Sequence, residues 1–463
     1  MQKKFTSILV ATDFLMASLA WASFFFFRKT VIEDAPFSVN TEFILGVILI
    51  PSFWITLHAL LGTYINPLRL YRMKILSLTA LSTLVGTVVI FFAFLLDDEI
   101  DGHHLYYKSI SAVFLLQFFY TLVPRFIIVN NLVKKVHAGK IGFNTLLIGG
   151  SQKAVDIHDE IKFNHQNSGN KFIGFVNLNG IDKNLEDRLP YLGHFNDFDK
   201  IIADLDIEEV IIALDSTEHE KLRKIIAKVS GRDLKIKVIP DMYDILSGSV
   251  KMNNIFGAPL IELNSEILPV WQRVLKRGID VICASIALIL LTPVYITLAI
   301  LVKTSSEGPI FFKQDRIGKN GIPFKIIKFR TMYIDAEKAG PQLSSSHDPR
   351  ITKIGRIMRK MRLDEFPQFW NVVKGDMSLV GPRPERQYFI DKILVVEPQF
   401  TQLNKVRPGI TSWGQVKYGY AENVHEMIQR MKYDLLYLKN MSLALDFKIM
   451  LYTILIVFKA KGK

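Results

Sequence analysis

Apolar residues gather in long stretches before residue 130, and four of these stretches approach the ~20 residues that a helix needs to cross a bilayer. They lie near 5–27, 43–65, 75–96 and 107–128. We therefore expect residues 1–135 to form a bundle of four transmembrane helices. Asp13 falls inside the first stretch, where a lipid-facing carboxylate would be costly, so it should face another helix or lie shallow.

The loops between these stretches indicate how the bundle is oriented. Basic residues precede the first stretch, separate the second from the third and follow the fourth, whereas the loop over 97–101 carries four acids. Loops rich in Lys and Arg stay in the cytoplasm. Both ends of the bundle, and everything after it, are therefore expected on the cytoplasmic face of a bacterial inner membrane.

A fifth apolar stretch, 281–302, is also long enough to cross, but it has basic residues on both sides. Pro293 lies within it and should bend the helix. We interpret residues near 279–302 as a re-entrant helix that returns to the same face, with a plain transmembrane helix as the alternative.

The C-terminal run 442–463 fits an interfacial helix better than a crossing, because Asp446 and Lys448 interrupt it early.

Between the apolar regions, residues 141–265 alternate short strands with helices. Strands are predicted at 144–148, 172–176, 208–213 and 235–239, with helices to about Phe163 and over 196–204 and 217–230. This alternation predicts a parallel, Rossmann-like (CoA-binding-like) α/β domain. Gly149 and Gly150 follow the first strand but lack the full dinucleotide fingerprint, which favours a tight turn over a bound nucleotide.

Composition narrows the classes of partner. The chain has 463 residues, 49% of them hydrophobic, and a net charge of +13. Such charge suits nucleic acid, an anionic membrane or phosphorylated substrates. Few aromatics interleave with the basic residues, so we expect no nucleic-acid partner, and the single Cys283 excludes a cysteine metal site.

Two adjacent acids, Asp364 and Glu365, follow a strongly basic stretch at 350–362. They lie at a predicted helix start, since Pro367 fits a first turn and Gly375 fits a C-cap. Nearby positive charge and helix-terminal N–H groups favour ionised carboxylates and also bind phosphate. Such a carboxylate can attack phosphorus or ligate Mg²⁺. The alternatives are a helix N-cap for Asp364 and a solvated first-turn acid for Glu365.

Further basic residues have the chemistry of phosphate recognition. Arg383 lies between Pro382 and Pro384 in a stiff turn that would fix its guanidinium. Lys328 and Arg330 alternate along a strand-like run and are expected to point to one face. A surface turn and a solvated strand face are the alternatives.

From about residue 273 to 459 the chain resembles the bacterial sugar transferases of the polyprenyl-phosphate phosphoglycosyl transferase superfamily, monotopic type. The resemblance rests on motifs in order: Lys-Arg-Gly-Ile-Asp at 276–280, the Pro293 break, Lys-Phe-Arg-Thr-Met at 328–332, Leu-Asp-Glu at 363–365, Gly-Asp-Met-Ser-Leu-Val-Gly-Pro-Arg-Pro at 375–384 and Arg-Pro-Gly-Ile-Thr at 407–411. It implies a monotopic, α-rich catalytic domain over 270–463. The whole layout resembles the large form that starts exopolysaccharide, capsule or O-antigen repeat units.

The resemblance also implies a mechanism. Asp364 matches the nucleophile that attacks the sugar-proximal phosphorus of a UDP-sugar, expelling UMP, and Glu365 matches the acid that holds Mg²⁺. A polyprenyl phosphate at the lipid bilayer then takes the sugar phosphate. Arg383 with Pro382 and Pro384 matches a nucleotide-binding element, and the positions matching basic residues that line the site are Lys328, Arg330 and Arg359.

The chain departs from the family pattern at two places. Ser412 replaces a common glycine, and Lys417-Tyr418-Gly419 replaces Asn-Gly-Arg, a change that we expect to affect sugar choice or loop shape. Arg362 replaces a serine that often precedes the acids.

Glucose or galactose is the default sugar that the resemblance implies, and a homo-oligomer is left open. The rival hypotheses are a glycosyltransferase that releases UDP and a membrane sensor without enzymatic activity.

Overall fold

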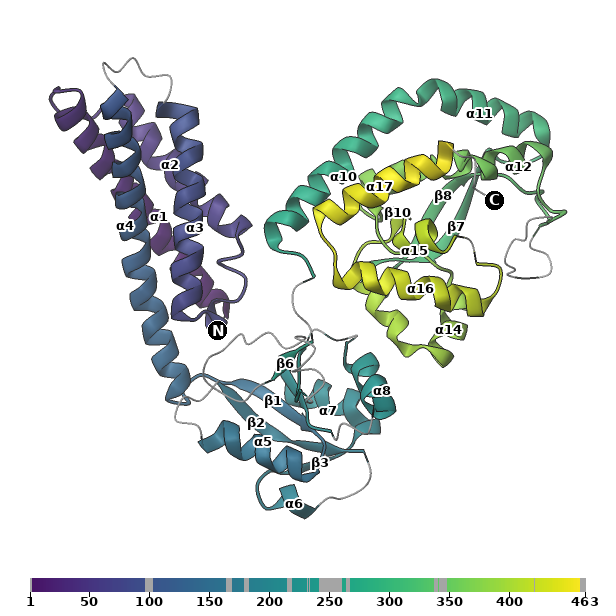
Figure 1. The fold of residues 1–463 in the computed structure, drawn as a ribbon, viewed down its shortest axis with the longest axis horizontal. Helices are drawn as coiled ribbons and strands as arrows, with labels where there is room; N and C mark the ends of the chain where they lie inside the picture. The colour runs from purple at the N-terminus through teal and green to yellow at the C-terminus, as the bar shows by residue number, and fades with distance from the viewer. Residues whose placement is uncertain are drawn as a thin grey trace.

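The computed structural model describes residues 2–95, 103–163, 169–178, 183–214, 219–230, 232, 234–240, 260–263, 267–336, 340, 348–419 and 421–458. Figure 1 shows three parts: a bundle of long helices at the N-terminus, a sheet flanked by helices, and a C-terminal part that is mainly helical. Their order along the chain is the one that the sequence predicts.

The N-terminal bundle contains four helices, and each is long and apolar enough to cross a membrane. They are α1 (Gln2–Phe27), α2 (Thr41–Leu60), α3 (Arg72–Ile90) and α4 (His103–His137). The four predicted spans are therefore confirmed as helices. Two bounds differ most: the chain turns after Leu60 instead of continuing to 65, and α4 extends beyond 128 to His137, because no Gly or Pro occurs between Pro124 and Gly139.

Asp13 faces another helix, as expected, and forms a buried ion pair. Its carboxylate accepts hydrogen bonds from Arg125 Nε at 2.8 Å and Nη2 at 2.7 Å, and Tyr64 Oη donates at 2.6 Å. Arg125 Nη1 also donates to Thr79 Oγ1 at 3.1 Å. These contacts join α1, α3, α4 and the turn after α2, so the acid in the first span is satisfied by the bundle itself.

The middle part is a Rossmann-like sheet in the order β3-β2-β1-β4-β5-β6, parallel except for β6. Its strands are β1 (Phe143–Ile148), β2 (Asn170–Asn177), β3 (Tyr191–His194), β4 (Glu209–Ile212), β5 (Lys235–Val238) and β6 (Ile261–Glu262). Its helices are α5 (Gln152–Phe163), α6 (Lys183–Glu186), α7 (Phe198–Leu205) and α8 (His219–Ser230). The four predicted strands are present, and β3 and β6, of four and two residues, are additional.

Gly149 forms a tight turn directly after β1. Its φ is +121°, and a Cβ there would lie 2.2 Å from the Ala213 carbonyl oxygen. Only glycine fits so close to the chain that follows β4. The packing of the sheet therefore accounts for this glycine without a ligand.

The C-terminal part combines helices with two small two-stranded sheets. Its strands are β7 (Phe311–Ile317), antiparallel to β8 (Pro323–Phe329), and β9 (Ser378–Val380), parallel to β10 (Gly409–Thr411). Its helices are α10 (Val270–Leu290), α11 (Thr292–Ser305), α12 (Lys353–Lys360), α13 (Gln368–Lys374), α14 (Gln387–Val396), α15 (Trp413–Lys417), α16 (Val424–Lys439) and α17 (Leu443–Phe458).

The apolar stretch around Pro293 is broken into two helices. α10 and α11 are bent by 63° at Leu291, and Pro293 lies in the first turn of α11, where its missing N–H costs nothing. In Figure 1 the two helices arch over one side of the C-terminal part.

At the far end of the chain, Asp446 of α17 is buried and accepts hydrogen bonds from Lys276 and Tyr437, both at 2.7 Å, so α17 is tied to α10.

Candidate functional site

The two acids lie in a short 3₁₀ turn, Leu363–Glu365, just before α13. Asp364 is 7% exposed and Glu365 5%. Neither side chain caps the turn or α13, so the capping and solvated alternatives do not describe them. Gly375 ends α13 with φ +104°, as its position in the sequence predicts. The two acids are therefore buried side chains that neither cap a helix nor lie in solvent.

Backbone geometry turns the acids inward. α12 ends at Lys360, and Arg362 then adopts the left-handed conformation, with φ +56° and ψ +21°. This conformation is uncommon for a residue with a Cβ and often marks functional sites. Tyr295 of α11 donates from its hydroxyl to the Phe366 carbonyl at 2.8 Å, which fixes the turn beside the broken helix.

Three cations surround the Glu365 carboxylate. Lys328 Nζ lies 2.9 Å from Oε1, Arg383 Nη1 lies 3.8 Å from Oε1, and Arg362 Nη1 lies 3.6 Å from Oε2. They come from the strand β8, the turn after β9 and the position directly before the Leu363–Glu365 turn. Elements that are distant in sequence thus converge on a single carboxylate.

The electrostatics of the two acids differ. Burial raises the pKa of the Asp364 carboxyl to about 6. The charge of Lys328 opposes this shift, and the charge of the neighbouring Glu365 adds to it. Burial also acts on Glu365, but Lys328, Arg362 and Arg383 outweigh it and hold the pKa of that carboxyl well below its usual range. Two adjacent acids with separated pKa values are typical of catalytic sites.

Lys328 reaches Glu365 because β8 is anchored to α13. Asn371 is buried, its Oδ1 accepts from the Ile327 N–H at 3.1 Å, and its Nδ2 donates to the Lys325 carbonyl at 2.9 Å. One amide therefore pairs with the strand on both sides of Ile326. This contact sets the distance between the strand and the acidic turn.

The structure gives Lys328 and Arg330 different partners. β8 ends at Phe329, and the buried Arg330 guanidinium donates to the carbonyls of Val302, Ser306 and Glu307 around the end of α11. The common face expected for Lys328 and Arg330 is thus not found, because strand alternation stops before Arg330. Its contacts are those of a residue that caps α11.

Arg359 of α12 acts on Asp364. Its Nε donates to Thr331 Oγ1 at 2.9 Å, and its charge lowers the pKa of Asp364. Of the predicted basic residues, Lys328, Arg359 and Arg383 are therefore close enough to act electrostatically on the acids.

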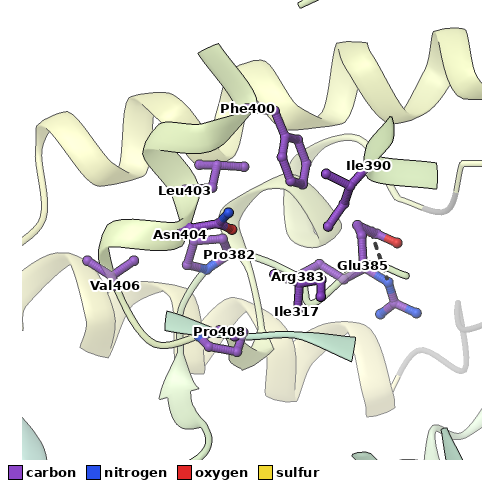
Figure 2. A pocket seen from close by; sticks show the side chains of 11 residues that line it. Ile317, Pro382, Arg383, Glu385, Ile390, Phe400, Leu403, Asn404, Val406 and Pro408 are labelled. Carbon is purple, nitrogen blue, oxygen red and sulfur yellow. Dashed lines mark ion pairs between the residues drawn. The ribbon is translucent and has the colours of Figure 1, made fainter. Parts of the chain in front are cut away.

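The Pro382-Arg383-Pro384 turn is held by Glu385, a residue for which the sequence analysis proposed no role. Glu385 is buried, and Arg430 Nη2 lies 2.5 Å from its Oε1. Arg316 Nη1 lies 3.6 Å from Oε2, and Arg383 Nε lies 3.9 Å from Oε1. Figure 2 shows the Arg383–Glu385 pair at the edge of a small pocket whose other side chains, apart from Asn404, are apolar.

These additional residues gave little signal in the sequence. Glu385 directly follows the Pro-Arg-Pro motif. Arg316 lies 69 positions before Glu385 and Arg430 lies 45 positions after it, both in charged stretches without a recognisable motif. Burial raises the pKa of Asp434, one helical turn after Arg430, to about 6. A buried face of α16 thus contributes to the site.

No group of three or more His, Cys, Asp or Glu side chains within the described ranges could hold a metal ion. Asp364 and Glu365 offer two adjacent carboxylates. Mg²⁺ commonly binds to one or two carboxylates and completes its shell with substrate phosphates and water. The donor set therefore fits a magnesium ion that arrives with a diphosphate.

Residues 271–460 match the family described as bacterial sugar transferase, and residues 60–240 match a CoA-binding domain. The second match includes α3 and α4 as well as most of the Rossmann-like sheet, so it crosses the boundary expected between the bundle and the α/β domain.

Three curated relatives are similar to the chain. A UDP-N-acetylgalactosamine-undecaprenyl-phosphate N-acetylgalactosaminephosphotransferase of Aeromonas hydrophila is 37% identical over 57% of this chain and 58% of its own length. A UDP-glucose:undecaprenyl-phosphate glucose-1-phosphate transferase of Escherichia coli is 33% identical over 54% of each chain. An uncharacterized sugar transferase of Haemophilus influenzae is 30% identical over 72% of this chain and 73% of its own. The chain thus spans little more than half of the first two relatives.

Proposed function

The chain belongs to the bacterial sugar transferase family, and on this premise we propose that it transfers a sugar 1-phosphate from a UDP-sugar to undecaprenyl (polyprenyl) phosphate. The observation that carries the proposal is the buried Asp364–Glu365 pair with Lys328, Arg362 and Arg383 gathered on it. The product would start a repeat unit of an exopolysaccharide, capsule or O-antigen.

The proposed first step uses Asp364 as the nucleophile. One carboxylate oxygen forms a bond to the sugar-proximal phosphorus, and the bond from that phosphorus to the bridging oxygen breaks. UMP leaves with the electron pair, and the sugar phosphate stays on the aspartate. Asp364 suits this role because Glu365 receives all the ion pairs found between the two acids and the described basic residues.

In the second step a phosphate oxygen of the polyprenyl phosphate attacks the same phosphorus. The aspartyl oxygen leaves with its electron pair, which restores the Asp364 carboxylate and gives a polyprenyl diphosphate sugar. Dividing the transfer into two displacements lets one set of cations serve both. Lys328, Arg359 and Arg383 would balance the negative charge of the diphosphate during each displacement.

Glu365 is the proposed ligand of Mg²⁺, because its lowered pKa keeps the carboxylate ionised. When bound, the ion would neutralise charge on the diphosphate. Glu365 also holds Lys328 and Arg383 close to the proposed nucleophile.

The location proposed for the protein is the cytoplasmic face of the bacterial inner membrane. The four apolar helices would span the bilayer, and the bent pair α10–α11 would enter it and return to the same face. Tyr295 links α11 to the acidic turn, so the re-entrant helix would hold the site at the depth of the lipid phosphate. A soluble protein would have to extract that acceptor from the membrane.

The test is nucleotide release by the full chain in nanodiscs, with Mg²⁺, undecaprenyl phosphate and UDP-glucose, UDP-galactose or UDP-N-acetylgalactosamine. We expect repeated UMP release only when lipid phosphate is present. Asp364→Asn should lower it at least about a thousandfold, because the nucleophile is removed. Asp391→Asn is the matched control, since Asp391 only accepts a surface hydrogen bond from Gln387.

Other outcomes support the rival hypotheses. Release of UDP would indicate a glycosyltransferase that breaks the sugar–oxygen bond. Absence of release with every donor, together with wild-type behaviour of Asp364→Asn, would favour a membrane sensor.

A further inference from the structure

Gln415 is a buried side chain whose amide has no partner. It is 6% exposed, and neither its Nε2 nor its Oε1 has a hydrogen bond to any described group. Its helix α15 packs on α17 through Trp413 and Val416, which belong to the apolar core. A buried polar group left unpaired costs about 1–3 kcal/mol. A donor and an acceptor kept together at such cost suggest that a ligand binds them.

The backbone places Gln415 beside the Arg383 turn. Asp434 of α16 accepts a hydrogen bond from the Gly414 N–H at 2.8 Å, and the Arg383 backbone N–H lowers the pKa of the same carboxyl. One carboxylate therefore lies close to both the residue before Gln415 and the residue that pairs with Glu365. A Cβ on Gly414 would lie 2.7 Å from Arg430 Cγ, which shows how closely α15 packs on α16.

The strand pair β9–β10 gives the same placement independently. The strands are parallel, with Ser378 opposite Gly409 and Val380 opposite Thr411. The Arg383 turn leaves the end of β9, and α15 begins just after β10. Since carboxyl ends of adjacent parallel strands meet at one edge, the two segments emerge side by side.

We infer that Gln415 binds an uncharged part of the nucleotide sugar, through a group that offers a hydrogen-bond donor and an acceptor side by side. The inference rests on the proposed function, in which Lys328 and Arg383 hold the diphosphate. The uracil edge and the sugar hydroxyls both have this chemistry and flank the diphosphate. The stretch 411–419, in which the chain departs from its family, would then form part of the donor site.

The experiment compares Gln415→Met with the wild-type full chain in nanodiscs. Methionine keeps the length of the side chain and removes both polar groups. We expect the apo protein to keep or raise its Tm, because an unsatisfied amide is lost. The Kd for the UDP-sugar should rise roughly tenfold, the effect of one or two lost hydrogen bonds. Gln429→Met, at a surface position bonded to Lys432, is the control.

Calorimetry with separate ligands identifies the contacted group. An equal rise in the Kd for UMP and for the UDP-sugar would assign Gln415 to the base, and a rise for the intact UDP-sugar alone would assign it to the sugar. Both results support the inference. If Gln415→Met does not fold, Gln415→Asn, which keeps the amide but shortens it, should weaken binding at unchanged Tm.

An unchanged Kd for every nucleotide would overturn the inference, and a lowered Tm would then indicate a purely structural amide. The proposed function fails separately, when wild-type protein binds a UDP-sugar but releases no UMP. In that case the change in Kd still tests Gln415. Wild-type protein that binds no nucleotide would overturn both.

Discussion

Lys328 Nζ lies 2.9 Å from Glu365 Oε1, although 37 positions separate the two residues in the chain. Lys328 is on β8 and Glu365 is in the turn before α13, and Asn371 holds these elements together. The charge of Lys328 therefore favours the ionised form of Glu365, the acid next to the proposed nucleophile.

Replacing Lys328 by Met should lower kcat/KM for UMP release about 10²–10³-fold, because a buried cation aimed at the diphosphate is lost. Lys328→Arg should recover part of the rate, since it keeps the charge but changes the geometry. Lys325→Met on the same strand is the control, as its side chain is exposed and pairs only loosely with Asp315 at 3.5 Å. Equal effects at 325 and 328 would contradict the role of the pair.

The pH dependence of the first step should report Asp364. Its carboxylate is the reactive form, so kcat/KM should be constant well above the pKa of about 6 and fall tenfold per pH unit below it. Arg359 lowers this pKa. Arg359→Gln should therefore move the acid limb to higher pH. An acid limb that stays in place or moves to lower pH would show that another group controls the step.

Gly409→Ala should disturb the Pro-Arg-Pro turn through the backbone. A Cβ on Gly409 would lie 2.1 Å from the Gly381 nitrogen, so β9 and β10 would have to separate. Overpacking of this kind costs about 1–3 kcal/mol, so both Tm and UMP release should fall. Gly278→Ala is the control, because a Cβ added at position 278 would have no atom within 4 Å. Retained Tm and activity in Gly409→Ala would mean that the strand separation does not set the turn.

Asp13→Asn should destabilise the N-terminal bundle, because Arg125 would remain buried without its counter-charge. Breaking one side of a buried ion pair costs about 3–5 kcal/mol. Thermal unfolding in detergent would measure this loss, with the exposed Glu42→Gln as control. The double variant Asp13→Leu, Arg125→Met should be less destabilised than Asp13→Asn. A greater loss in the double variant would show that the pair is not the main interaction.

The sequence determined the features that depend on local pattern. Long apolar runs specified four helices, since the bilayer fixes the length of a span, and alternation of strands and helices specified the parallel sheet. Local turn chemistry predicted Gly375 at the end of α13 and a break near Pro293. The acids were singled out by the charge around them.

Only the tertiary structure decided how the candidate residues are used. It buried Asp364 and Glu365, although the local pattern alone also fitted a helix cap for Asp364 and a solvated acid for Glu365. It also directed Lys328 to the acids but Arg330 to the end of α11. It also brought Arg430 to Glu385 across 45 positions. Burial and ion pairing depend on which elements pack together, and residue order does not reveal this for contacts so far apart.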